Sequence, residues 1–221
     1  MEHHDILRWL HVLAMTYWLG GEWGVFNASR QLAKPEISLD ERRRHMETAY
    51  RIDILARTGI ILLLPLGLHM GHDLGVQPLG GPWLTGMWIV FAAWISLTWA
   101  AFFKRDTDIG LKLTKIDESI RYVVIPLLLY FGIKSLVTGG PLLAKWYAAK
   151  VTIYACLLII GLILRVIMRR WVLVFRRIAA EGPTPDLQGQ LSRSLRLGMN
   201  LAYIYWIGIA SVAFLGVVKP F

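Results

Sequence analysis

Residues 145–168 read KWYAAKVTIYACLLIIGLILRVIM, an apolar run with few charged side chains. An α-helix needs about 20 apolar residues to cross the roughly 30 Å hydrocarbon layer of a bilayer. Similar runs occur at residues 5–29, 50–73, 84–103, 121–138 and 197–218. The sequence therefore predicts an all-α fold: a polytopic integral membrane bundle of about six transmembrane helices, forming one transmembrane domain over residues 1–221.

The composition agrees with this prediction. Of the 221 residues, 56% are hydrophobic and only 18% are charged, and the mean hydropathy is +0.50. These values exclude an ordinary soluble domain and a disordered chain. A single cysteine, Cys156, excludes a disulfide framework. The first apolar run is too long for a signal peptide and lacks a small-x-small cleavage site, so we expect it to remain in the protein.

The positive charge, a net +9, is concentrated in alternate connections. Residues 30–57, 104–121 and 165–196 hold 19 of the 24 lysines and arginines. The positive-inside rule then predicts that these three segments are cytoplasmic and that both termini lie outside. We expect the basic loops to contact lipid head groups, which makes the bilayer the partner and excludes nucleic acid.

Local motifs predict where several helices begin and end. Ser38–Glu41 fits a capping box, which predicts a helix start there. The sequence Gly182-Pro183-Thr184-Pro185 predicts a break between a basic continuation of span 145–168 and an amphipathic stretch before the last span. Glycines between residues 71 and 82 predict an outer turn.

Ionisable side chains inside the spans are costly in hydrocarbon, so we expect them to face the bundle interior and to serve function. They are His11, Glu22, His69, Lys134 and Lys150. At 1.5 Å per residue, the predicted topology places His11, His69 and Lys150 about 5–9 Å below the outer boundary. We therefore predict one pocket near the outer face, with His3, His4 and His72 just above it.

Haem b is the leading predicted cofactor for this pocket, since imidazole ligates its iron and apolar residues enclose it. His11 is the preferred axial ligand and His69 the second candidate. Trp18 and Gly21 are predicted cofactor contacts, and Lys150 or Lys134 would pair with a propionate. Copper is the alternative, because His and Met are both copper ligands.

Several motifs resemble the HemJ-type bacterial membrane protoporphyrinogen oxidases. They are His11-Val12-Leu13 followed by Trp18 and Gly21, the pair Trp146 and Lys150, and the ending Val217–Phe221. The resemblance implies haem b, oxidation of protoporphyrinogen IX, electron transfer to quinone or another respiratory carrier, and location in the bacterial inner (cytoplasmic) membrane. It also implies that the family's functional His and Lys are His11 and Lys150.

This chain departs from that family by an inserted helix pair at about residues 80–140. The wider group, which includes CopD-like membrane proteins, has more spans. Four interpretations therefore stay open. They are a membrane oxidoreductase in which Lys150 and Glu22 are catalytic, a non-enzymatic cytochrome b-like relay or anchor subunit of a membrane complex, a CopD-like copper transport protein, and a structural membrane subunit without a cofactor.

Overall fold

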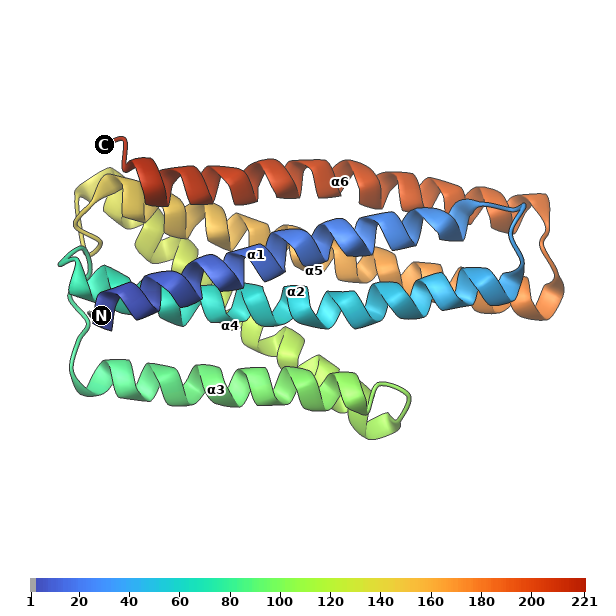
Figure 1. The fold of residues 1–221 in the computed structure, drawn as a ribbon, viewed down its shortest axis with the longest axis horizontal. Helices are drawn as coiled ribbons and strands as arrows, with labels where there is room; N and C mark the ends of the chain where they lie inside the picture. Colours follow the sequence, from blue (N-terminus) through green and yellow to red (C-terminus); the bar gives the residue numbers. More distant parts are fainter. Residues whose placement is uncertain (1–2) are drawn as a thin grey trace.

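A computed structural model describes residues 3–221, and helices account for most of them. The elements are α1 (His3–Arg30), the 3-10 helix η1 (Gln31–Ala33), α2 (Leu39–Asp73), α3 (Pro82–Phe103), α4 (Asp108–Thr138), α5 (Lys145–Glu181) and α6 (Pro185–Val218). Most of the helices run back and forth along one long axis, whereas α4 is inclined to it, and the start of α1 and the C-terminus lie at the same end (Figure 1). The predicted all-α bundle is confirmed.

Five helices, α2 to α6, are long and apolar enough to cross a membrane by length and composition. The chain is therefore a multi-pass helical membrane protein. Helix α1, predicted as the first span, is not among these five, although it is 28 residues long. It carries His11 and Glu22, and it packs along α2 and α6.

Local capping explains several helix boundaries. The Ser38 hydroxyl accepts a hydrogen bond from the Glu41 backbone N–H at 3.2 Å, which confirms the predicted start of α2. Thr184 caps α6 in the same way through the Leu187 N–H. The predicted break at Gly182–Pro185 is confirmed, but the amphipathic stretch after it belongs to the same continuous helix as the last span.

The helix pair at the predicted insertion forms a hairpin on one flank of the bundle. Helix α3 packs against α2 and α4, and α4 packs against α5. The loop between α3 and α4 ends short of the far end reached by α1, α2, α5 and α6 (Figure 1). The hairpin therefore leaves the other four helices as a compact group.

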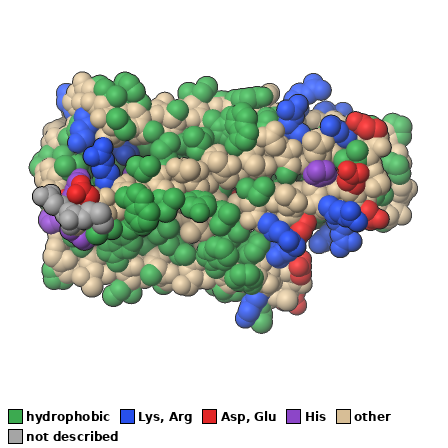
Figure 2. Space-filling model, in the orientation of Figure 1, with side chains coloured by type: hydrophobic (Ala, Val, Ile, Leu, Met, Phe, Trp, Pro, Cys, Tyr) green, Lys and Arg blue, Asp and Glu red, His purple; other side chains and the backbone are tan. Residues whose placement is uncertain are grey.

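The core between these helices contains large, fully buried side chains, among them Trp18, Leu66, Leu157, Tyr205 and Ile209. On the face shown in Figure 2, apolar side chains dominate the middle of the molecule, and charged side chains gather toward its two ends. A bilayer requires this pattern, because only the middle of the bundle meets hydrocarbon.

Candidate functional site

The cavity that we call the His11 cavity lies between α1, α2, α5 and α6. Its lining is mostly apolar, with His11, Tyr147, Lys150 and Tyr154 as the side chains that carry polar atoms. His11 comes from α1 and Lys150 from α5, so two predicted site residues from distant parts of the sequence meet at one cavity.

The His11 ring lies close to α2 at a position where α2 has a glycine. A Cβ on Gly67 would lie 3.4 Å from the Cε1 atom of the His11 ring. The Nδ1 atom of His11 is buried and has no hydrogen-bond partner among the described residues. A buried polar atom without a partner is unfavourable, and such atoms in native proteins usually have a specific reason. This imidazole is therefore available to a ligand.

Lys150 brings a positive charge to the same cavity. No carboxylate in residues 3–221 forms an ion pair with it, and its ammonium group lies over α6, 2.6 Å from where a Cβ on Gly216 would be. The Tyr147 hydroxyl, one helical turn earlier, donates to the Gly67 carbonyl at 3.1 Å and ties α5 to α2. The cavity thus offers one imidazole and one unpaired cation within an apolar lining.

His69 does not line this cavity. Its ring belongs to a group at the terminal end of the bundle that we call the His69 cluster, made of His3, His4, His69 and Asp73. The Trp88 indole N–H donates to His69 Nδ1 at 3.1 Å, and His69 Nε2 lies 3.4 Å from His3 Nε2. Both ring nitrogens of His69 therefore already have partners outside the His11 cavity.

Trp18 and Gly21 have helix-packing contacts. Trp18 is 1% exposed, and its indole N–H donates to the Tyr205 hydroxyl. A Cβ on Gly21 would lie 2.8 Å from the Ala56 Cβ, so this glycine allows α1 and α2 to approach closely. Neither residue lines the His11 cavity.

Lys134 was expected to face the bundle interior, and that prediction was wrong. Its side chain is exposed on α4, and its ammonium group donates to the Tyr130 hydroxyl at 3.3 Å. Long cationic side chains on the outside of a membrane helix extend toward the interface, which accounts for this position.

Glu22 lines a second cavity, the Glu22 cavity, nearer the opposite end of the bundle. Three arginines from three helices also line it: Arg57 of α2, Arg121 of α4 and Arg165 of α5. At 1.5 Å per residue, Glu22 lies about 16 Å further along α1 than His11. The two predicted catalytic side chains, Lys150 and Glu22, therefore line different cavities.

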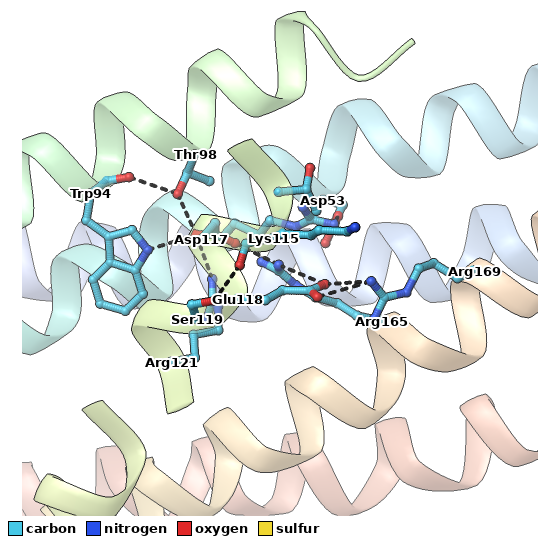
Figure 3. A network of polar contacts seen from close by, with 12 residues as sticks. Asp53, Trp94, Thr98, Lys115, Asp117, Glu118, Ser119, Arg121, Arg165 and Arg169 are labelled. Carbon is cyan, nitrogen blue, oxygen red and sulfur yellow. Dashed lines mark hydrogen bonds and ion pairs between the residues drawn. The ribbon is translucent and has the colours of Figure 1, made fainter. Parts of the chain in front are cut away.

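Arg121 and Arg165, which line the Glu22 cavity, also belong to an ion-pair network (Figure 3). Asp117 is its centre and accepts hydrogen bonds from Arg165 at 2.7 Å, Trp94 at 2.8 Å and Thr98 at 2.9 Å. The neighbouring Glu118 accepts from Arg169 at 3.0 and 3.1 Å. These contacts connect α3, α4 and α5 through charges that are mostly buried.

The network leaves some donors free. The Nε and Nη2 atoms of Arg121 and the Nη2 atom of Arg165 are buried without a hydrogen-bond partner in the described part of the chain, although Arg121 Nη2 lies 3.8 Å from the Asp117 carboxylate. Chemically, they can donate to an oxygen acceptor that enters the cavity.

Sequence reasoning missed this network, because Arg57, Arg121 and Arg165 were counted among the cytoplasmic loop charges. A signal was present. Asp53 and Arg57, and Asp117 and Arg121, are spaced i,i+4, the spacing at which opposite charges meet on one helix face.

A scan against protein-family models, a search of curated proteins and a search of solved structures found no match to this chain. The resemblance to HemJ-type proteins thus rests on the residues quoted for it.

Proposed function

We propose that this membrane protein binds haem b in the His11 cavity and acts as an integral membrane oxidoreductase of the protoporphyrinogen oxidase type. The observation that carries the proposal is the meeting of His11 and Lys150 at one mainly apolar cavity. These are the two residues to which the family resemblance assigns the functional His and Lys, so their proximity supports the proposal.

Two side chains of the cavity have the chemistry that this cofactor requires. A neutral imidazole ligates haem iron, and His11 is the histidine of the cavity lining. A propionate needs a cation, and Lys150 has no carboxylate partner among residues 3–221. The absence of a side chain at Gly67 lets the His11 ring lie against α2. His69 is not needed in this arrangement, so we propose a single protein ligand from the cavity lining.

Bound haem b would supply one-electron redox chemistry. His11 would hold and orient the iron, and the apolar walls from α2 and α5 would keep water from it. Lys150 would pair with a carboxylate of the cofactor or of a porphyrinogen substrate. Electrons removed from the substrate would pass to a quinone, which takes up an equal number of protons as it becomes a quinol. With another respiratory carrier as acceptor, the protons of the substrate would pass to water. The corresponding location is the bacterial inner membrane.

The test is an absorption spectrum of detergent-purified protein, oxidised and then reduced with dithionite, after haem-replete expression. We expect a Soret band in the wild-type protein and its loss in His11→Ala. The matched control is His45→Ala, which changes a histidine outside the His11 cavity and should keep the band. A wild-type protein without a Soret band would contradict the proposal.

A second measurement separates an enzyme from an electron-relay subunit. Expression in cells that lack protoporphyrinogen oxidase should restore porphyrin synthesis with the wild-type chain and not with His11→Ala. Haem binding without rescue would assign the chain to the relay or anchor class.

A further inference from the structure

The His69 cluster brings together metal-ligating side chains where α1 begins and α2 ends. The Nε2 atoms of His3 and His69 lie 3.4 Å apart. These two nitrogens and a carboxylate oxygen of Asp73 all lie within 4.8 Å of one another. The Nδ1 atom of His4 is 3.5 Å from the Asp73 carboxylate.

The separation of the two imidazole nitrogens agrees with a shared metal ion. Tetrahedral Zn²⁺ binds imidazole nitrogen at about 2.0–2.1 Å, which places two ligand nitrogens about 3.4 Å apart. The Asp73 carboxylate oxygen lies within 4.8 Å of both nitrogens, at the exposed end of α2, where its side chain is free to change rotamer. Two imidazoles and one carboxylate form a common ligand set for Zn²⁺ that leaves the fourth position open.

We propose that His3, His69 and Asp73 bind a divalent transition-metal ion of the zinc class at this end of the bundle, in a site separate from the His11 cavity. His4 then serves as the partner that orients the Asp73 carboxylate. Ligating carboxylates generally have such a hydrogen-bonding partner.

Trp88 of α3 competes with the metal ion. An indole N–H is only a donor, so its hydrogen bond to His69 Nδ1 places the neutral ring's proton on Nε2, facing His3. Ligation through Nε2 requires this proton to move to Nδ1, and Trp88 must then release the ring. Removing the indole N–H is therefore expected to tighten metal binding about two- to tenfold, which corresponds to the net value of one hydrogen bond.

The experiment is titration of Zn²⁺ into tag-free, chelator-treated full-length protein in detergent, followed by calorimetry. We expect one Zn²⁺ site in the wild-type chain. His69→Ala and Asp73→Asn should each weaken it at least about tenfold, since the loss of even an outer-shell partner of a metal ion costs about 10- to 100-fold. His3→Ala removes a ligand at the exposed start of α1 without altering the packed helices, and it should have the same effect. Trp88→Phe should tighten binding.

Two controls make the result specific. His45→Ala and His11→Ala should leave Zn²⁺ affinity unchanged, and His69→Ala should leave the Soret band unchanged, so this inference and the proposed function fail independently. Wild-type Zn²⁺ affinity in the His3→Ala/His69→Ala double variant would overturn the proposal. Weaker binding in Trp88→Phe would overturn the assignment of His69 Nε2 as the ligand atom.

Discussion

The Trp18 indole N–H donates a hydrogen bond to the Tyr205 hydroxyl across 3.2 Å, deep in the bundle, and joins α1 to α6. The rings also meet edge to face, with centroids 5.6 Å apart. Both side chains are at most 2% exposed. Helix α1 is not among the helices that are apolar enough to be candidate membrane spans. Buried contacts of this kind therefore hold it against the other helices.

Tyr205→Phe should therefore destabilise the protein by about 1 kcal/mol, because it leaves the Trp18 N–H without an acceptor in a buried, apolar place. For a chain of this size that corresponds to a fall in Tm of about 2–4 °C, measured by circular dichroism in detergent. Tyr203→Phe is the control, since Tyr203 is 53% exposed. Equal Tm values for the two variants would contradict this prediction.

Gly59→Ala should loosen the packing of α1 on α2. A Cβ on Gly59 would lie 2.5 Å from the Ala14 carbonyl oxygen and 2.9 Å from the Trp18 nitrogen, both backbone atoms that cannot move aside alone. Overpacking of this kind costs about 1–3 kcal/mol. Gly20→Ala, where nothing lies within 4 Å of the added Cβ, should leave the Tm unchanged or slightly raised. A tolerated Gly59→Ala would show that the two helices are less close than described.

Asp117→Ala should destabilise more than either of these changes. It removes the carboxylate that Arg165 and Trp94 contact and leaves buried arginines unpaired, which costs about 3–5 kcal/mol. Asp117→Asn, which keeps an acceptor for Trp94, should fall between this variant and the wild type. Asp106→Ala is the matched control, because the Asp106 side chain is 90% exposed. Yield of folded protein by gel filtration and the Tm provide the ranking.

Lys150→Met should weaken haem retention about tenfold or more, the value of a charge-assisted hydrogen bond to a carboxylate. The measurement is haem transfer to a competing haem-binding protein. Lys134→Met removes an exposed lysine outside the cavity and should have no effect. Gly216→Ala should act in the direction of Lys150→Met, since the added methyl group would displace the Lys150 ammonium. Unchanged haem transfer in Lys150→Met would remove Lys150 from the site.

The positive-inside orientation can be tested with single cysteines in a Cys156→Ser background. A cysteine at Leu79, 46% exposed in the loop before α3, should react with a membrane-impermeant maleimide in intact cells. A cysteine at Asp106, in the loop between α3 and α4, should react only after permeabilisation. The reverse labelling pattern would contradict this topology and would show that the loop before α3 is cytoplasmic.

Much of the helix pattern could be predicted because it depends on local chemistry. The Ser38 cap, the break at Gly182–Pro185 and the glycine turn before α3 are encoded within a few residues of where they act. Helix α4 shows the limit. It begins at Asp108 but was expected only from residue 121, because charged residues interrupt the apolar ones in its first turns. A search for apolar runs does not detect a helix start of this kind.

The candidate site was predictable only in part. His11 and Lys150 were selected by their depth in the membrane. This depth can be calculated from the number of residues between each side chain and the end of its span. The same argument placed His69 with them, but depth says nothing about which way a side chain points around its helix. Packing turned His69 toward His3 and Trp88, and it turned Lys134 outward.

The sequence by itself determined that this is a helical membrane bundle, where most helices begin and end, and which few polar residues interrupt the apolar spans. Tertiary structure decided which of those polar residues meet. Arg42, in the basic segment 30–57, is 1% exposed and donates to the Leu32 carbonyl and to Gln188, contacts that its charge alone did not predict. The physical reason is that hydropathy and capping act between neighbours in the chain, whereas ion pairs, ligand sets and cavities depend on how helices rotate and pack against one another.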